Sequence, residues 1–152
     1  MSQRFSVRRA RLSDLDRVLE IEHAGFGQWA WDRNLFAEHI RKCGETFLVA
    51  VRQDRVIGYC ITWIFPGLVR RRAELVSIAV DPVVRGKGAA DALMTAALRA
   101  LQRRGIPRLG LMVKVTNERA RAFYEKYRFR RIRRVPHYYE DGEDGLLFRL
   151  DL

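Results

Sequence analysis

The order in which β-rich and helical segments follow one another constrains this fold more than any other feature of the sequence. Four segments with apolar residues at helical spacing alternate with β-rich runs in the order β-α-α-β-β-β-α-β-α-β-β. The β-rich runs are expected near residues 5–7 and at 46–52, 56–65, 73–80, 109–115, 129–135 and 146–150. Residues 53–55 predict a hairpin turn between the second and third runs. The helices are expected near residues 15–21 and 35–40, the second with Asp32 as its N-cap, from about 88 to 104, and at 117–127. Ser13 and Asp16 are placed to form a capping box at the start of the first helix. Hairpins combined with a strand–helix–strand crossover predict an α/β sheet with helices on both faces.

The length and composition of the chain exclude several classes of protein. The 152 residues favour one compact domain over residues 1–152, and the apolar content of 48% argues against disorder. The longest uncharged stretch, residues 56–69, is too short for a membrane span, and the N-terminus lacks the apolar core of a signal peptide. Cys43 and Cys60 have no partners at metal-ligand spacing. This predicts a cytoplasmic protein with reduced thiols and no metal site.

The strong positive charge predicts an anionic partner. Lysine and arginine number 29 against 18 aspartate and glutamate residues, which gives a formal net charge of +11. Such a charge attracts nucleic acid, an acidic protein or a phosphate-rich cofactor, and it repels polycations. The arginines cluster at Arg8, Arg9 and Arg11, at Arg70, Arg71 and Arg72, and at Arg128, Arg130, Arg131, Arg133 and Arg134. The alternative interpretation is that they decorate solvated faces.

Residues 80–90 have the composition of a loop that binds an anion. The segment leaves a β-rich run and enters an alanine-rich helix, whose N-terminus presents unpaired N–H groups and about half a positive charge. Gly86 and Gly88 allow the backbone to wrap closely around phosphate oxygens, and Arg85 and Lys87 add cations. The segment lacks both the Walker A pattern GxxxxGK[ST] and a complete GxGxxG fingerprint. The alternative is a glycine turn that only begins a helix.

Four segments carry a resemblance to a known family. The motif Arg85-x-x-Gly88-x-Ala90 resembles the diphosphate-binding motif of the GNAT superfamily of acetyl-CoA-dependent N-acetyltransferases. Residues 117–129 resemble the N-x-x-A-x-x-[FL]-Y-x-x-x-G-F helix of that superfamily, with Arg128 in place of the glycine. Residues 138–144 are similar to the YYxDGEDA segment of Nα-terminal acetyltransferases. Residues 21–31 look like the helix–loop–helix entry of RimI-type ribosomal-protein-alanine acetyltransferases.

This resemblance covers nearly the whole chain and implies a fold, a reaction and a cofactor. The fold is a GNAT-type mixed, mostly antiparallel twisted sheet of about seven strands with helices on both faces. The reaction is direct transfer of acetyl from acetyl-CoA to an amine, with acetyl-CoA or CoA as the cofactor. The residues that would bind the pantetheine are Ile78, Ala79 and Val80, with a backbone N–H near Val80 stabilising the oxyanion, and Asn117, which would otherwise be only a helix N-cap. The residues that would hold the diphosphate are Arg85, Gly86, Lys87, Gly88, Ala89, Ala90 and Asp91.

The resemblance also assigns a general acid but leaves the base open. Tyr124 matches the tyrosine that protonates the departing thiolate, and its alternative role is a core aromatic. RimI-type enzymes carry a glutamate twelve residues before that tyrosine, where this chain has Met112, which cannot take a proton. Glu22 in the first helix is the first candidate for a substitute base. The other candidates are Glu74, His137 and Glu140.

The acceptor follows from the missing base. An α-amine, with a pKa of ~8, has a larger neutral fraction at neutral pH than a lysine side chain at ~10.4, so the missing base favours an N-terminal acceptor or deprotonation through a water chain. Tyr138 and Tyr139 would line the peptide slot, or be ordinary hairpin aromatics. The first hypothesis is an Nα-acetyltransferase of a protein or peptide N-terminus, such as a ribosomal one, with non-specific RNA or ribosome contact through the arginines and no membrane partner. The alternatives are a small-amine acetyltransferase of the same fold, a catalytically silent acetyl-CoA-binding interaction module, and a nucleic-acid-binding domain.

Overall fold

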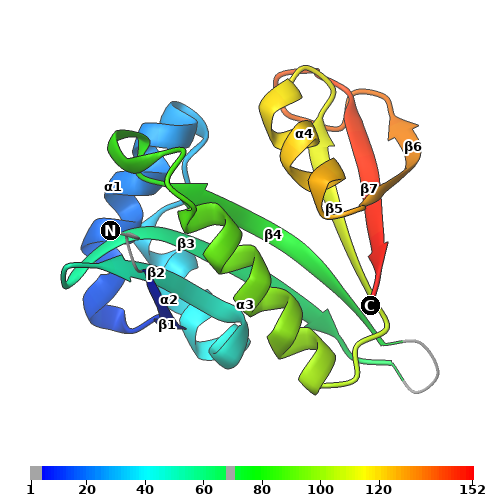
Figure 1. Cartoon of the computed structure of the whole chain (residues 1–152). Helices are drawn as coiled ribbons and strands as arrows, with labels where there is room; N and C mark the ends of the chain where they lie inside the picture. Colours follow the sequence, from blue (N-terminus) through cyan, green and yellow to red (C-terminus); the bar gives the residue numbers. More distant parts are fainter. Residues whose placement is uncertain (1–4, 68–70) are drawn as a thin grey trace. The chain divides into compact units, whose positions relative to one another are not determined.

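The computed structural model describes residues 5–67 and 71–152, and within them the strands and helices follow the predicted order (Figure 1). The strands are β1 (Ser6–Arg9), β2 (Phe47–Arg52), β3 (Arg55–Phe65), β4 (Arg72–Val80), β5 (Arg108–Lys114), β6 (Arg130–Val135) and β7 (Gly145–Asp151). The α-helices are α1 (Leu15–Phe26), α2 (Arg33–Cys43), α3 (Ala89–Arg103) and α4 (Glu118–Lys126). Short 3₁₀ turns are η1 (Leu12–Asp14), η2 (Gly27–Trp29), η3 (Gly44–Thr46) and η4 (Pro82–Val84). Arg70 of the second arginine cluster lies outside the described residues.

The seven strands form one sheet in the order β1-β2-β3-β4-β5-β7-β6. The pairs β1–β2, β2–β3, β5–β7 and β6–β7 are antiparallel. The pair β4–β5 is parallel, with Ala73 opposite Leu109 and Glu74 opposite Gly110. The predicted fold class, a mixed and mostly antiparallel seven-stranded α/β sheet, is confirmed.

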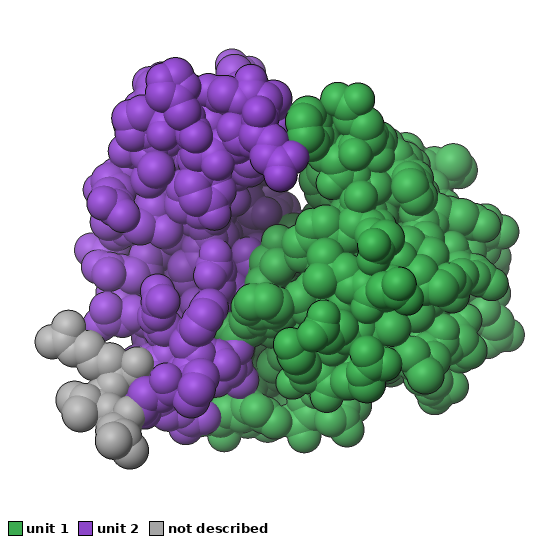
Figure 2. Space-filling view, turned by 180° about the vertical axis from the view of Figure 1, so that it is seen from behind, with its two compact units in different colours: residues 1–63, 76–104 green, residues 64–75, 105–152 purple. Residues whose placement is uncertain are grey.

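Contacts divide the chain into two compact units, which Figure 2 distinguishes by colour. Unit 1 comprises residues 1–63 and 76–104, and its sheet carries α1 and α2 on one face and α3 on the other (Figure 1). Val18 of α1, Phe36 of α2 and Tyr59 of β3 belong to the core cluster on the first face. On the α3 side, a side chain on Gly58 would meet the Ala79 carbonyl oxygen at 3.0 Å and Leu93 Cδ1 at 3.2 Å. Glycine therefore allows the close packing of β3 against its neighbours.

Unit 2 comprises residues 64–75 and 105–152. Leu109, Leu111 and Val113 of β5 are buried on one face of the strand, and their partners on β7 include buried Leu146 and Phe148. The alternate residues of β5 are half-buried on the opposite face. This period-2 pattern is what the sequence predicts for a strand with one covered face.

The start of the first helix differs from the prediction. Ser13 lies in η1 rather than at the N-cap, and the residue before α1 is Asp14. The Asp14 carboxylate accepts a hydrogen bond from the Arg11 N–H at 2.7 Å and pairs with both guanidinium nitrogens of Arg8 at 2.8 and 2.9 Å. The predicted Ser13–Asp16 capping box is therefore wrong: α1 begins after Asp14, whose carboxylate contacts Arg8 and the Arg11 N–H and does not cap the helix.

The predicted N-cap of the second helix and the predicted hairpin turn between β2 and β3 are confirmed. Asp32 caps α2 by accepting the Leu35 N–H at 2.9 Å, and Gln53 and Asp54 form the β2–β3 turn with φ of +49° and +59°. Cys43 and Cys60 are free thiols. In the described part of the chain, no helix has the length and apolar character needed to cross a membrane. The same residues contain no group of three or more His, Cys, Asp or Glu side chains arranged to hold a metal ion.

Candidate active site

Residues 81–88 form a largely exposed loop that leads from β4 to the N-terminus of α3. Gly86 has a φ of +78°, and Gly88, the N-cap, has a φ of +95°, both in the left-handed region that favours glycine. The first helical hydrogen bond runs from the Ala92 N–H to the Gly88 carbonyl at 3.0 Å. The N–H groups of the first turn precede this bond and point out of the helix end, where they can bind an anion.

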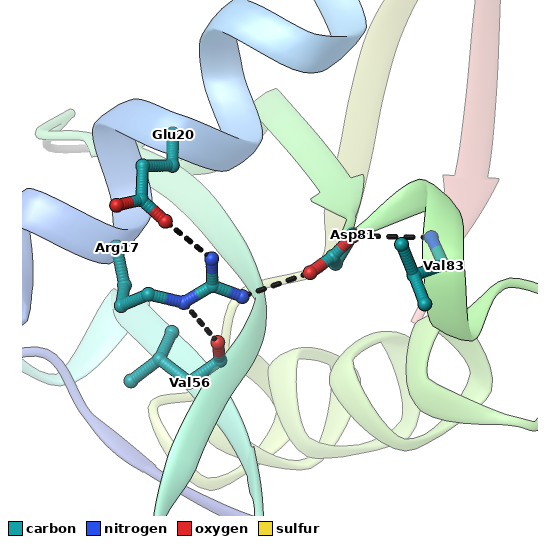
Figure 3. Close-up of polar contacts among 5 residues, drawn as sticks. All are labelled: Arg17, Glu20, Val56, Asp81 and Val83. Atoms are coloured by element: carbon teal, nitrogen blue, oxygen red, sulfur yellow. Dashed lines mark hydrogen bonds and ion pairs between the residues drawn. The ribbon is translucent and has the colours of Figure 1, made fainter.

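Arg17 of α1 fixes the start of this loop (Figure 3). Its guanidinium donates to the Val56 carbonyl at 3.0 Å, to Glu20 at 2.5 Å and to Asp81 Oδ2 at 2.9 Å. Asp81 Oδ1 accepts the Val83 N–H at 3.0 Å, so one carboxylate joins the helix to the η4 turn. The Arg17 hydrogen bond is the largest cause that holds the pKa of Asp81 below its usual range, so this group stays ionised at neutral pH.

The backbone of β4 presents polar groups along one edge. The Asp81 N–H donates to the Ile57 carbonyl of β3 at 2.8 Å. Because successive residues of a strand direct their N–H and C=O groups to opposite sides, those of Ile78 and Val80 face away from β3. They can pair with an extended ligand as an added strand would.

Glu22 of α1 lies inside unit 1. Its side chain is 3% exposed and accepts hydrogen bonds from the Tyr59 hydroxyl and, at 3.3 Å, from the Trp31 N–H. The Tyr59 oxygen is also 3.2 Å from Ser77 Oγ on β4. Burial raises the pKa of Glu22 to about 7, and the Trp31 hydrogen bond opposes part of this rise. A carboxyl group in this state can accept and release a proton near neutral pH.

In unit 2, helix α4 positions Asn117 and Tyr124. Asn117 Oδ1 accepts the Ala120 N–H at 3.1 Å and caps the helix, which leaves its NH₂ group as the donor it can offer a ligand. Tyr124 is 8% exposed and its ring lies 5.7 Å from that of Phe129. The helix ends with the hydrogen bonds Phe129 N–H to Tyr124 carbonyl and Arg128 N–H to Glu125 carbonyl, which is the Schellman arrangement. Arg128 has a φ of +67°, the conformation for which the family motif uses glycine.

Met112 packs on a glycine of the neighbouring strand. An added Cβ on Gly145 would lie 2.6 Å from Met112 Cε and 3.1 Å from Tyr138 Cβ. Gly145 therefore makes the space that the Met112 side chain occupies. At this position β5 therefore carries an apolar thioether side chain, where a carboxylate would provide a base.

The segment between β6 and β7 is held by an acidic turn. Lys114 of β5 pairs with Asp141 at 2.5 Å and Glu143 at 3.3 Å, and its Nζ lies 5.3 Å from the centre of the Tyr139 ring. Tyr138 and Tyr139 meet edge to face at 5.0 Å, and Tyr138 is 49% exposed. An exposed aromatic on a fixed turn can contact a peptide.

Residues 14–129 match the acetyltransferase (GNAT) family. This chain belongs to that family. It is 34% identical to the N-alpha-acetyltransferase of Sulfolobus acidocaldarius, over 97% of this chain and 93% of that protein. It is 32% identical to the putative [ribosomal protein bS18]-alanine N-acetyltransferase of Bacillus subtilis, over 97% and 95% of the two chains. Its fold matches the ribosomal-protein-S18-alanine N-acetyltransferase of Escherichia coli with a TM-score of 0.81 and 27% identity, over 97% and 94%.

These findings confirm the predicted family, fold class and enzyme class: the chain is a GNAT N-acetyltransferase. Of the predicted site residues, Glu22 and those of the strand and loop between Ile78 and Asp91 lie in unit 1. Asn117, Tyr124, Tyr138 and Tyr139 lie in unit 2. Among the other candidates for a base, His137 and Glu140 are exposed, and Glu74 is half-buried on β4.

The sequence analysis did not identify several residues of this candidate site. Arg17, Tyr59 and Ser77 meet partners 64, 37 and 18 residues away along the chain, so no local spacing indicates them. Gly145 had a signal in the sequence, because it stands where the similar segment of Nα-terminal acetyltransferases ends in alanine. That change, read together with Met112, could have indicated a compensating pair.

Proposed function

We propose that this GNAT protein transfers the acetyl group of acetyl-CoA to the α-amine of a protein N-terminus. The observation that carries the proposal is its likeness, over 97% of its length, to a protein named N-alpha-acetyltransferase. The likeness to a ribosomal-protein-alanine acetyltransferase supports the same type of acceptor. We propose as well that residues 1–152 act as one domain, since the matched family range includes parts of both units. We also propose that the protein acts in the cytoplasm.

The loop and the β4 edge fit a CoA-type ligand. The first-turn N–H groups of α3 would hold the diphosphate, because the left-handed conformations of Gly86 and Gly88 leave them accessible. Arg85 and Lys87 would be the flanking cations. The β4 backbone at Ile78–Val80 would align the pantetheine, and the Asn117 amide would donate to it. Acetyl-CoA supplies the thioester, whose carbonyl carbon the amine attacks as the C–N bond forms and the C–S bond breaks.

The chain's own groups would then manage charge and protons. The Val80 N–H faces away from β3 and would donate to the carbonyl oxygen as negative charge builds on it, an effect worth ~3–4 kcal/mol for a preorganised donor. The Tyr124 hydroxyl would protonate the departing thiolate. Tyr138 and Tyr139 would contact the acceptor peptide beside its first residues.

A peptide assay tests this proposal. Octapeptides that differ only in having a free or a formylated N-terminus are incubated with acetyl-CoA, and CoA release is measured. We expect turnover with the free peptide alone and a fall of about 10²-fold for Tyr124→Phe, at an unchanged Kd for CoA. Turnover only with polyamines or amino sugars would support the small-amine alternative. CoA binding without transfer to any amine would support the silent interaction module.

We further propose that an arginine surface contacts RNA. Residues 119–134 contain eight cations against one carboxylate, Glu125, and all residues from Arg130 to Arg134 are exposed on β6 at the end of the sheet order. Arg130 and Arg134 pair with Asp151 and Asp144 at 2.9 and 2.6 Å. The density of positive charge fits a polyanion such as the RNA of a ribosome.

Fluorescence anisotropy with a single-stranded RNA tests the arginine surface. We expect binding that weakens steeply from 50 to 200 mM salt and a Kd at least tenfold higher when Arg131 and Arg133 are both changed to glutamate. The matched control changes Arg99 and Arg103, two exposed arginines of α3, to glutamate. Equal losses in the two double variants would show that only net charge matters.

A further inference from the structure

The chain contains two buried carboxylates whose surroundings differ. Asp14 is 6% exposed and pairs with Arg8 through two hydrogen bonds, which is the arrangement of a structural ion pair. Glu22 is 3% exposed, and its partners are a phenol hydroxyl and one backbone N–H. Among the described residues, no charged side chain contributes to the pKa shift of Glu22. Burying a carboxylate without a cation is costly, and an amide would fill the same hydrogen-bonding site without that cost.

A hydrogen-bond chain leads from Glu22 to the strand assigned to the thioester. The Tyr59 hydroxyl donates to Glu22 Oε2 and lies 3.2 Å from Ser77 Oγ. Tyr59 is fully buried, with its ring 5.6 Å from that of Phe36, so its hydroxyl is held between the two groups. Ser77 is half-buried and directly precedes residues 78–80 of β4. All three residues of this hydrogen-bonded series, Glu22, Tyr59 and Ser77, belong to unit 1.

We propose that Ser77, Tyr59 and Glu22 form a proton relay that replaces the carboxylate missing at Met112. The inference rests on the function proposed above. The ammonium form of the acceptor gives one proton to Ser77 Oγ, Ser77 gives its hydroxyl proton to Tyr59, and Tyr59 gives its own to Glu22. The acceptor becomes the neutral amine that attacks, Glu22 becomes a neutral acid, and Glu22 returns the proton to water after product leaves. In this scheme Ser77 touches the acceptor, whereas Tyr59 and Glu22 act through it.

The relay accounts for the placement of the groups that face Glu22. Tyr59 faces it from β3, Ser77 follows Tyr59 on β4, and the Trp31 N–H faces it from the segment after η2. A carboxylate whose pKa lies near the pH of the medium accepts and releases protons with little driving force in either direction. A purely structural carboxylate would gain nothing from such a value.

The test is the pH dependence of kcat for an N-terminal peptide at saturating acetyl-CoA, from pH 6 to 9.5. In wild type we expect kcat to rise through an apparent pKa near 7. Tyr59→Phe keeps the buried ring and removes the hydroxyl, and Glu22→Gln keeps the shape and removes the titration. Both variants should lose about 10²-fold in kcat at pH 6.5 and recover to within about threefold of wild type at pH 9.5, where the acceptor is already neutral. KM for acetyl-CoA should stay within twofold.

Two further variants distinguish a proton relay from the general effect of losing a hydroxyl group. Ser77→Ala changes a half-buried residue and should show the same pH-dependent loss. Thr62→Val, a matched control, removes another buried hydroxyl of β3, which has no hydrogen-bond partner among the described residues, and its kcat should equal that of wild type at every pH. Losses in kcat of the same size at pH 6.5 and 9.5 in Tyr59→Phe and Glu22→Gln would overturn the relay, because their pH profiles would then run parallel to that of wild type. An inactive wild type at every pH would instead contradict the proposed function.

Discussion

The buried carboxyl of Glu22 predicts how the stability of the protein depends on pH. Its pKa rises from 4.5 to about 7 on folding because burial disfavours the charged form. The folded protein therefore binds more protons than the unfolded chain between these values, and its stability falls as the pH rises through them. At roughly 1.4 kcal/mol per pKa unit, the full effect is about 3 kcal/mol. About 2 to 3 kcal/mol of this loss should occur between pH 5 and 8.5.

The assay compares wild type with Glu22→Gln by urea unfolding across that range. The amide does not titrate, so the free energy of unfolding of Glu22→Gln should gain on that of wild type by about 2 to 3 kcal/mol from pH 5 to 8.5. Glu140→Gln changes an exposed glutamate and should follow wild type at each pH. A constant difference between wild type and Glu22→Gln over the whole range would refute the reasoning, because it would mean that folding leaves the pKa of Glu22 unchanged.

Three other substitutions test the supports of the site. Arg17→Met removes the contact that fixes the start of the loop and should raise the Kd for CoA about tenfold by calorimetry, whereas exposed Arg41→Met should not. Gly145→Ala should destabilise the protein by about 1 kcal/mol, because the terminal methyl of Met112 must move aside, and part of that cost should vanish in a Met112→Ala background. Arg128→Gly should stabilise the protein by about 1 kcal/mol in thermal unfolding, because glycine relieves the positive φ.

A different result for any of these three substitutions would contradict the reason given for it. An unchanged Kd in Arg17→Met would mean that the loop keeps its shape without the helix contact. Equal costs for Gly145→Ala in both backgrounds would show that Met112 is not the group that requires glycine. A lower melting temperature for Arg128→Gly would mean that the arginine side chain contributes more than its backbone strain costs.

The element order could be predicted from the sequence because its signals are local. The β2–β3 turn at Gln53 and Asp54 and the N-cap at Asp32 depend on residues within a few positions of each other, and both were found as expected. The Ser13–Asp16 capping box failed for a related reason. Its pattern is local, but η1 precedes the helix, and the Asp14 carboxylate there contacts Arg8, a residue of another element.

The chemistry of the site could be predicted only in part. The glycines of the loop before α3 and the tyrosine of α4 stand in contiguous motifs, so the family resemblance assigned them residue by residue. Glu22 was predicted as a base from its place in α1, but its burial and its link to Tyr59 and Ser77 depend on three elements packing together. Periodicity identifies which face of a strand or helix is covered, and it does not identify which buried polar groups meet.

The proposed function requires the acceptor to be an α-amine. It is tested most directly by tandem mass spectrometry of a peptide with one free N-terminus and one internal lysine, after incubation with this protein and acetyl-CoA. We expect a gain of about 42 Da, the mass added when one acetyl group replaces a hydrogen, only in fragments that contain the N-terminal residue. Acetyl groups found only on the lysine side chain would contradict it.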